Sequence, residues 1–408
     1  MRVTTPCCVS TCRRSARLDE SGRVNVGSPG ECARRAGASV YENCAATGLA
    51  RAGRHMRVSA RRGKEAASFR ALLVVGADGT HSLVARSVGL LRDDPRYVAV
   101  SQRAYVEGVS VGKGEAAFFF DSDLFPGYGW MFPMSGGRAN IGIGILAEAR
   151  SRYGISVPRL FQAFVEKLRN QHPGCAGIHL ASKPLGGIVK TYGSAGPNHF
   201  DGGVLVGDAG CFVDPVTGEG ITPAAESALI ASAVLAEAVE QGRSDARFLS
   251  RFEDEFRRYF DPAMRYLDLC AAVMRNRFMR EFWLSAVARG CQKATEDAEF
   301  ARIAGSAFGG MEIRPLSILS QIWITLVEDI GSAGACLPLE LLSGRPARLN
   351  AWLSDTAAWY EGWWRSALDD PLWHSAWTAD VLHKWTRLVG TLDGPSDPRA
   401  RGPLARFE

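Results

Sequence analysis

Asp208 and the glycines that follow it are the residues of this chain whose types and spacing could do chemistry. Asp208 comes directly after an apolar run, and Gly218 and Gly220 lie just before a long apolar stretch. A carboxylate at a strand end accepts hydrogen bonds from hydroxyl groups, and glycines let backbone amides approach a flat ligand closely. The start of a helix carries partial positive charge and favours an anion. The pattern indicates a site for a polyol beside a flat, electron-poor ring.

The elements that would position these groups can be read on either side of the loop. Residues 204–206 form an apolar run that is typical of a short buried strand. Thr222 and Pro223 predict a helix start, with Thr222 as the N-cap and Pro223 at the first helical position, and the helix continues to about Gln241. Its expected packed face consists of Ile221, Ala225, Ala228, Leu229, Leu235 and Val239. A lone Gly-Asp is usually structural, but the full string is far more specific.

Residues 206–221 resemble the second flavin motif of the FAD-dependent oxidoreductases that share the para-hydroxybenzoate hydroxylase fold. The resemblance implies that Asp208 binds the ribityl chain, that residues 215–220 line the isoalloxazine ring, and that the helix at Thr222 stabilises the anionic reduced flavin. The implied cofactor residues here are Gly207, Asp208, Pro215, Gly218, Glu219, Gly220 and Ile221. The sequence of residues 218–221 is most similar to that of geranylgeranyl reductases at this position. Flavin halogenases have Ser-Ser-Gly-Val at the position of residues 218–221, although residues 211–215 are close to the halogenase sequence.

A second motif lies 130 residues before Asp208. Residues 71–75 read as a buried strand, and Asp78 and Gly79 follow it. The segment resembles the family's Gly-Ala-Asp-Gly-x-x-Ser-x-Val-Arg motif, with one alanine inserted before Arg86. The resemblance implies that Asp78 contacts FAD between ribityl and pyrophosphate and shapes the route of NAD(P)H, the expected electron donor. Asp78 and Gly79 are the implied cofactor residues of this motif. A second role for Asp78 is structural, as a cap of the turn after the strand. We expect Asp78 and Asp208 to converge on one nucleotide cofactor.

Between the two motifs, residues 97–106, 115–120 and 129–146 read as strands. Tyr128, Trp130, Phe132 and Pro133 resemble the Tyr-x-Trp-x-Phe-Pro motif of geranylgeranyl reductases, where halogenases carry Trp-x-Trp-x-Ile-Pro. Strand alternation places the three aromatic rings on one face. Such a face suits an elongated hydrocarbon or a flat ring beside the flavin, and an aromatic core face is the structural alternative. These four residues are the expected substrate-binding residues.

The N-terminus departs from the family pattern. Residues 1–30 show no strand or helix periodicity, and no Gly-x-Gly-x-x-Gly motif, whose helix start would hold the FAD pyrophosphate, occurs in the first hundred residues. A family-like course resumes with a helix end at residues 31–36 and strands at residues 38–41 and 57–60. We therefore expect a truncated family member that lacks the first βαβ unit.

Composition places the chain among ordinary soluble globular proteins, with 46% hydrophobic and 22% charged residues. A net charge of +5 is too small to argue for nucleic-acid binding. The 10 cysteines are scattered without zinc spacing, which favours reduced thiols in a cytoplasmic protein and gives no metal site. No membrane span is expected, because the best candidate, residues 221–239, contains Glu226 and Glu237.

The predicted fold is α/β (α+β): a partial Rossmann-like FAD-binding domain with an inserted antiparallel β-sheet substrate domain and a helical C-terminal region. The expected segments are a disordered or non-family N-terminus (1–30), a partial FAD-binding domain (31–95), the substrate domain (96–195), the second FAD-binding segment (196–245) and the helical region (246–408). The tryptophan-rich tail predicts two helices, broken at residues 369–371, that pack on the flavin domain. A lid or dimer contact is the alternative role, and residues from Leu392 onward read as a loose end.

Three functions remain open at this level. The first is an FAD-dependent reductase of C=C bonds in an isoprenoid, which the sequences of residues 218–221 and 128–133 favour. The second is a flavin-dependent monooxygenase or halogenase, and the third is a non-catalytic remnant. No acid or base is assigned as a catalytic residue. The expected partner is a hydrophobic small molecule, which allows a peripheral contact with a membrane, and the sequence does not predict an oligomeric state.

Overall fold

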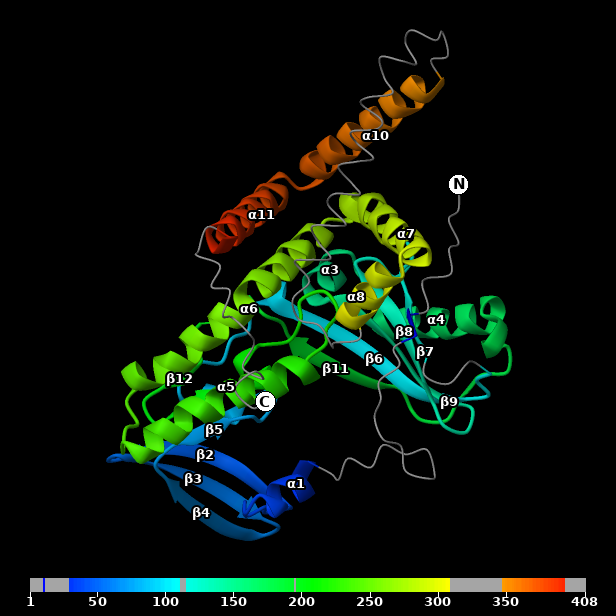
Figure 1. Cartoon of the computed structure of the whole chain (residues 1–408). Coiled ribbons are helices and arrows are strands. Elements are labelled where there is room, and N and C mark those ends of the chain that lie inside the picture. The colour runs from blue at the N-terminus through cyan, green and yellow to red at the C-terminus, as the bar shows by residue number, and fades with distance from the viewer. Residues whose placement is uncertain (1–9, 12–28, 111–114, 194–195, 309–346, 393–408) are drawn as a thin grey trace.

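The computed structural model describes residues 10–11, 29–110, 115–193, 196–308 and 347–392 of the 408-residue chain. The described residues form three β-sheets with helices packed against them, and two further helices, α10 and α11, lie at the end of the described chain (Figure 1). The predicted α/β class, with an antiparallel sheet and a helical C-terminal region, is confirmed.

A seven-stranded sheet forms the largest layer, with strand order β1-β7-β8-β9-β6-β10 and with β11 also paired to β6. Its pairings are antiparallel. The strands are β1 (Ser10–Thr11), β6 (Val98–Glu107), β7 (Glu115–Phe119), β8 (Gly127–Met134), β9 (Arg138–Leu146), β10 (His179–Leu180) and β11 (Leu185–Lys190). The predicted strand at residues 129–146 is thus two strands joined by a turn, because Gly136 and Gly137 both have positive φ.

One face of this sheet packs against the amphipathic helix α4 (Val157–Gln171). Met131 of β8, Ile141 of β9 and Ala104 of β6 lie in one cross-strand row and are buried on that face. Because successive side chains of a strand point to opposite faces, Trp130 and the residues paired with its row lie on the other face. We call the side opposite α4 the open face of the sheet.

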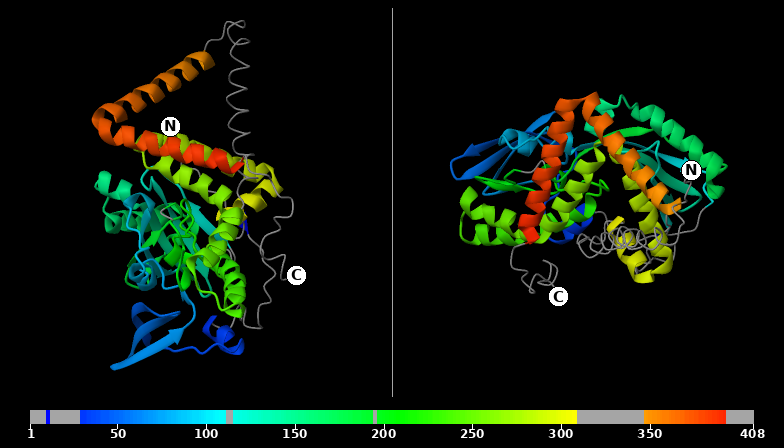
Figure 2. Two further views of the ribbon diagram at one scale, coloured as in Figure 1. Left: turned by 90° about the vertical axis from the view of Figure 1, so that its left-hand side faces the viewer. Right: turned by 90° about the horizontal axis from the view of Figure 1, so that it is seen from above.

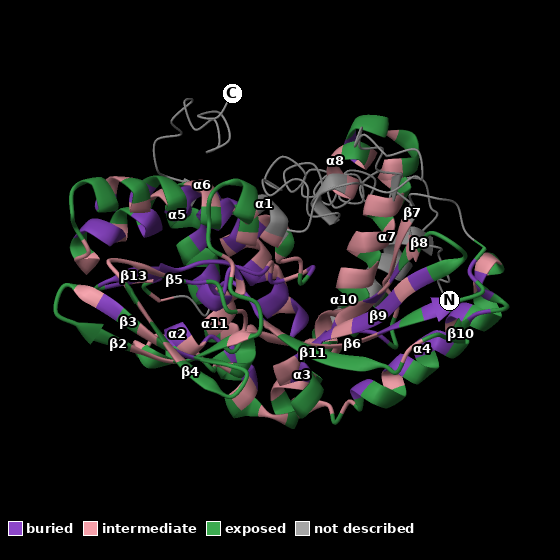
Figure 3. Ribbon diagram, turned by 90° about the horizontal axis from the view of Figure 1, so that it is seen from below, coloured by how far each residue is buried: buried purple, intermediate pink, exposed green. Residues whose placement is uncertain are grey.

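A second core joins a small sheet to two long helices. β5 (Val74–Gly76) runs parallel to β13 (Gly203–Leu205), which pairs with β12 (His199–Phe200). α5 (Ile221–Glu240) and α6 (Ala246–Met274) pack together over this sheet through a cluster that includes Val204, Ile230, Val234 and several phenylalanines of α6. Figure 3 shows the buried residues of β13, and those of β9 in the larger sheet, in purple. α2 (Leu83–Ser87) follows β5 after the loop of residues 77–82.

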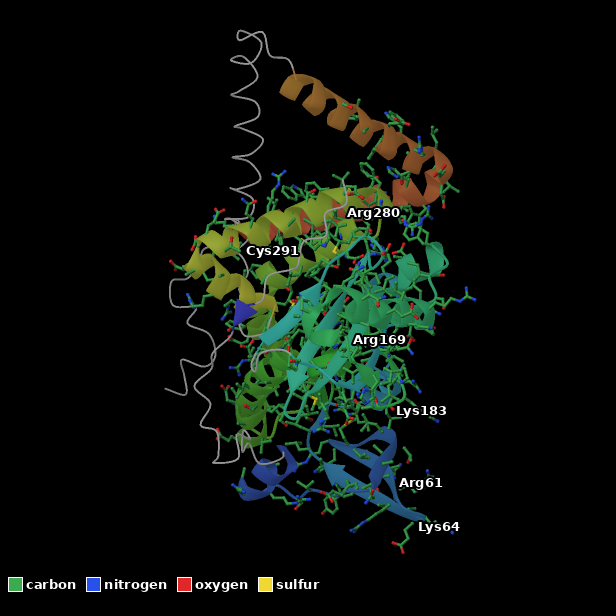
Figure 4. The ribbon with its side chains drawn as sticks, turned by 90° about the vertical axis from the view of Figure 1, so that its right-hand side faces the viewer. Arg61, Lys64, Arg169, Lys183, Arg280 and Cys291 are labelled. Atoms are coloured by element: carbon green, nitrogen blue, oxygen red, sulfur yellow. The ribbon has the colours of Figure 1, made fainter. Side chains whose placement is uncertain are left out.

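A third sheet, β2-β3-β4, extends from the small sheet and carries α1 (Pro29–Arg35) at its side. Its strands are β2 (Cys44–Ala52), β3 (His55–Arg62) and β4 (Glu65–Ala71). Figure 4 shows Arg61 and Lys64 at the outer tip of this sheet, away from the seven-stranded sheet. The predicted strand at residues 38–41 is wrong, because that segment leads irregularly from α1 to β2.

The C-terminal region is helical, as predicted. α6 is followed by η4 (Arg277–Met279), α7 (Arg280–Glu296) and α8 (Ala298–Phe308). α10 (Ala347–Asp369) and α11 (Pro371–Leu392) meet at the predicted break, and α11 packs along α6 while α10 projects away from the body (Figure 2). The predicted loose end after Leu392 lies outside the described residues. The remaining short elements are η1 (Pro95–Tyr97), α3 (Ala147–Arg152), η2 (Pro173–Cys175) and η3 (Gly207–Gly210).

α5 departs from its predicted packing. Ile221 and Val239 are 84% and 58% exposed, whereas Ile230, Val234 and Ala238 are buried. The helix is apolar on most sides, so hydrophobic periodicity could not identify the buried stripe. Among the described residues, α5 is also the one helix whose length and composition would allow it to cross a membrane. Its packing against α6 is that of a core helix.

Candidate functional site

The two sequence motifs meet at the carboxyl ends of two neighbouring strands. β5 and β13 are parallel, with Gly76 paired to Leu205, so the loops that follow them leave the same edge of the sheet. Thr80 donates a hydrogen bond to Asp208, with Oγ1 and Oδ2 3.3 Å apart, and its Oγ1 also lies 3.3 Å from the carbonyl oxygen of Ile188 in β11. The first motif therefore contacts both the second motif and the seven-stranded sheet.

Asp78 supports the first turn of α2, whose N-cap is Ser82. Its carboxylate accepts hydrogen bonds from Ser82 Oγ at 2.5 Å and from the amides of Leu83 and Val84 at 2.6 and 3.1 Å. The two amides belong to the first turn of the helix and have no hydrogen-bond partner within the helix. In this arrangement Asp78 shapes the loop, and its neighbour Thr80 makes the contact to Asp208.

Asp208 lies in η3, where close packing holds it against the loop that precedes α5. A Cβ added at Gly220 would lie 3.1 Å from Asp208 Oδ1, and one at Gly207 would lie 3.0 Å from Ala224 Cβ. Gly207 has φ +56°, and its amide donates to the buried Ser227 Oγ at 3.0 Å. Burial raises the pKa of the Asp208 carboxyl, and the hydrogen bond from Thr80 opposes the shift. The carboxylate therefore gains from any further donor.

One glycine in each of the two loops leaves the backbone open. Gly79 and Gly218 have φ values of +76° and +67°, and a Cβ added at either would meet no atom within 4 Å. Backbone in this conformation, with free space next to it, suits the close approach of a flat ligand. Together with the polyol-binding chemistry of Asp208, these residues fit FAD.

Asp214 organises the loop between η3 and α5. Its Oδ1 accepts hydrogen bonds from the amides of Val216 and Thr217 at 2.7 and 2.9 Å, and its own backbone pairs with Gly218 and Glu219. Pro215 is buried inside this turn. Burial raises the pKa of Asp214 above its ordinary value of 3.8, against the lowering effect of the Thr217 and Val216 amides. The loop thus closes around a carboxyl group whose charged form is unfavourable.

Replacing Asp214 by Asn is expected to raise the free energy of unfolding at neutral pH. A carboxyl whose pKa is raised by folding stabilises the protein below its unfolded pKa of about 3.8, and that contribution is lost as pH rises through the folded pKa. The amide does not titrate and keeps the Oδ1 acceptor. The difference in free energy of unfolding between the variant and the wild type should therefore grow as pH rises from about 4. Its final size is about 1.4 kcal/mol for each pH unit that separates the unfolded from the folded pKa. Urea unfolding at several pH values measures it, and a variant destabilised equally at every pH would contradict this account.

Glu219, and not Thr222, satisfies the first amides of α5. The helix begins at Ile221 with Gly220 as N-cap, and Glu219 Oε1 accepts hydrogen bonds from the amides of Ile221 and Thr222 at 2.7 and 2.9 Å. The predicted N-cap at Thr222 is wrong, because a carboxylate two residues upstream of Ile221 reaches these donors first. Burial raises the pKa of Glu219, and the Thr222 and Ile221 amides oppose the shift. An anionic ligand at this helix end would have to displace Glu219.

Tyr128 connects the aromatic face of β8 to the glycine loop. Its phenol donates a hydrogen bond to the carbonyl oxygen of Thr217. Burial raises the pKa of Tyr128, with Asp214 and Glu219 adding to the effect, so the phenol stays protonated and remains a donor. This bond spans 89 residues of sequence and joins the open face of the sheet to the candidate cofactor loop.

The three predicted aromatic rings form one continuous strip on the open face. Ring centroids of Tyr128 and Trp130 are 6.0 Å apart, and those of Trp130 and Phe132 are 6.2 Å apart with nearly parallel planes. Phe118 of β7 packs against both Tyr128 and Phe132. Pro133 has the opposite parity in β8, so it lies on the α4 side and not beside the three rings. We call Phe118, Tyr128, Trp130 and Phe132 the aromatic strip.

Sequence reasoning missed Thr80, Asp214 and Thr217. Thr80 stands within the Asp-Gly-Thr segment, and a hydroxyl next to a glycine turn is a signal for side-chain hydrogen bonding. Asp214 precedes a proline, where an aspartate commonly organises a turn. The contact from Tyr128 to Thr217 could not be read, because it depends on how the sheet and the loop pack together.

Several known proteins have similar sequences or a similar fold. The chain is 39% identical over 189 residues to "Digeranylgeranylglycerophospholipid reductase 2" of Methanothermobacter thermautotrophicus, which is 46% of each chain. It therefore spans about half the length of the curated relatives it matches. Its fold resembles the crystal structure of a geranylgeranyl bacteriochlorophyll reductase-like protein from Thermoplasma acidophilum, with TM-score 0.57 and 24% identity over 63% of this chain and 64% of that one.

A triple mutant of the flavin-dependent brominase Bmp2 has a similar fold, with TM-score 0.50 and 17% identity over 69% of each chain. The family model described as "FAD binding domain" matches residues 30–265, which is more than half of the 408 residues. The match includes both motifs and the whole seven-stranded sheet except β1. The chain belongs to the FAD binding domain family.

Proposed function

We propose that this protein is an FAD-dependent reductase that saturates C=C bonds in an isoprenoid lipid. The observation that carries the proposal is the hydrogen bond from Tyr128 to the Thr217 carbonyl, because it joins the aromatic strip to the loop proposed to line the flavin. The sequence relatives whose names describe reduction of geranylgeranyl phospholipids support the choice of substrate.

In this proposal Asp208 accepts hydrogen bonds from the ribityl hydroxyls, and the loop from Pro215 to Gly220 lies along the ring. Bound FAD supplies the hydride chemistry, and NAD(P)H is the proposed donor of electrons. The aromatic strip holds the hydrocarbon chain and excludes water from it. Tyr128 keeps the strip and the loop in register through its bond to Thr217.

Anaerobic turnover tests the proposal. Purified protein is reconstituted with FAD, reduced with NADPH, NADH or dithionite, and mixed with a lipid that carries geranylgeranyl chains. We expect flavin absorbance in the protein and a product that is heavier by two hydrogens per saturated bond. Consumption of oxygen with a hydroxylated or halogenated product, and no saturated product, would refute the reductase. A colourless protein that FAD cannot reconstitute would indicate a non-catalytic remnant.

The location of the protein is part of the proposal. A lipid substrate resides in a membrane, so we propose a cytoplasmic protein that contacts the membrane surface peripherally. Trp364, Leu368 and Leu372 are exposed where α10 meets α11 and would suit such a contact. Sedimentation with liposomes tests it, and protein that stays entirely in the supernatant would refute it.

A further inference from the structure

An arginine lies in the middle of the open face of the seven-stranded sheet. The strand register places Arg103 of β6 opposite Gly142 of β9, which in turn is opposite Trp130 of β8. Leu185 of β11 is paired with Arg103 on its other side. One cross-strand row therefore runs from the aromatic strip through a glycine to a cation and then to an exposed leucine.

The glycine in this row lets the aromatic strip extend toward the arginine. A Cβ at Gly142 would lie 2.2 Å from Cζ2 of Trp130, so the indole lies directly over β9. Asn140 Oδ1 accepts a hydrogen bond from Trp130 Nε1 at 2.9 Å and fixes the ring in this position. Tyr105 lies in the neighbouring row, and the guanidinium carbon of Arg103 is 5.0 Å from the centre of its ring. The arginine is thus bordered by aromatic surface.

Arg103 has no carboxylate partner among the residues that the structure describes. Its surroundings are apolar and open: Leu185, Phe132 and Tyr105 are 54%, 38% and 37% exposed. A cation on an apolar surface without a counter-ion favours an anionic ligand. The planar guanidinium matches phosphate oxygens in a bidentate manner, which an ammonium cannot do. The expected ligand therefore combines a long apolar body with a phosphate.

The geometry fits an elongated ligand that also reaches the glycine loop. Tyr128 of β8 and Ser101 of β6 lie in the same cross-strand row. Arg103 is therefore two strands away from Tyr128 across the sheet and two residues away along the strand direction. With strands about 4.8 Å apart and a rise of about 3.4 Å per residue, the separation is about 12 Å. We propose that Arg103 binds the phosphate head group of a polyprenyl substrate whose chain runs over the aromatic strip toward the Thr217 loop. This inference rests on the proposed reductase function and identifies the part of its substrate that sets specificity.

Paired ligands that differ only in the head group test the inference. Binding of geranylgeranyl phosphate, digeranylgeranylglyceryl phosphate and the two matching alcohols is measured for the FAD-reconstituted protein, R103Q, R103K and R61Q. Arg61 is the matched control, since it is an exposed strand arginine at the tip of the distant third sheet (Figure 4). R103Q should weaken binding of the phosphates about 10- to 100-fold and leave the alcohols unchanged. R103K should recover part of the loss, and R61Q should behave like the wild type.

The outcomes separate this site from the reductase activity. Equal affinity of the wild type for a phosphate and its alcohol, or a preference for phosphate that survives in R103Q, overturns the role of Arg103. A preference that depends on Arg103 without any saturated product supports the anion site and refutes the reductase. Saturation of both head-group forms with the same KM supports the reductase and refutes the anion site. The phosphate whose chain is reduced identifies whether the head belongs to a phospholipid or to a free prenyl phosphate.

Discussion

Replacement of Asp208 by Ala is expected to lower the affinity for FAD by at least about 100-fold, because it removes both acceptors proposed to hold the ribityl hydroxyls. A hydrogen bond to a charged group contributes roughly 1.5–3 kcal/mol, and two such bonds exceed the roughly 2.7 kcal/mol that corresponds to 100-fold. The carboxylate is half-buried, and Thr80 supplies one of its donors. Ligand hydroxyls would therefore relieve a group whose charged form burial disfavours, as its raised pKa indicates. Titration of the apoprotein with FAD, followed by flavin fluorescence, measures the change.

Two further variants make the result specific to the site. Asp208→Asn keeps the shape and one acceptor, so it should lose less affinity than Asp208→Ala. Asp123→Ala removes an exposed aspartate from the turn between β7 and β8 and should leave FAD binding unchanged. Equal affinities for Asp208→Ala and Asp123→Ala would show that the cofactor binds elsewhere, and the convergence of the two motifs would then have no role in FAD binding.

The features that sequence predicted correctly are those set by local pattern. The buried residues of α4 that include Phe161, Phe164, Val165 and Leu168 follow the helical period of its apolar positions, because an amphipathic helix has one apolar stripe. Alternation placed Tyr128, Trp130 and Phe132 on one face, because a strand has a period of two. The apolar run before Asp208 gave a strand shifted by one residue from the prediction.

The features that sequence did not predict depend on choices between competing groups. Thr222 and Glu219 could both satisfy the start of α5, and only the path of the loop decides for Glu219. Residues 71–75 read as one apolar strand, but Ala71 ends β4 and β5 begins at Val74, because two different sheets take the two ends of the run. Arg103 became visible only through the pairing register, which brings together residues of four strands. Long-range register of this kind is not encoded in any short window of sequence.

The C-terminal helix α11 is held to the body by buried charges as well as by tryptophans. Arg275, at the end of α6, is 3% exposed and forms ion pairs with Glu148 of α3 at 2.6 Å and with Asp380 of α11. Trp377 donates to the carbonyl oxygen of Ala272 at 2.8 Å. The predicted packing of the tryptophan-rich tail is thus confirmed for α11 alone, since α6 belongs to the same core as β13, whereas α10 projects away from the body.

Replacement of Arg275 by Met is expected to weaken this docking by about 1.5–3 kcal/mol, because Glu148 and Asp380 lose their shared, buried cation. Arg96 still pairs with Asp380 and the Trp373 indole still donates to Glu148, so neither carboxylate is left without a partner. Hydrogen exchange of the α11 amides and urea titration of tryptophan fluorescence should both report release of α11 before the rest of the protein unfolds. Arg365→Met is the matched control: it removes an exposed arginine of α10 that pairs with Glu361 one turn away, and such surface pairs contribute little. If the α11 amides were protected equally well in both variants, the buried arginine would not be what holds α11. The hydrogen bond from Trp377 to Ala272 and the buried ion pair between Lys384 and Asp268 would then be left as its attachment to α6.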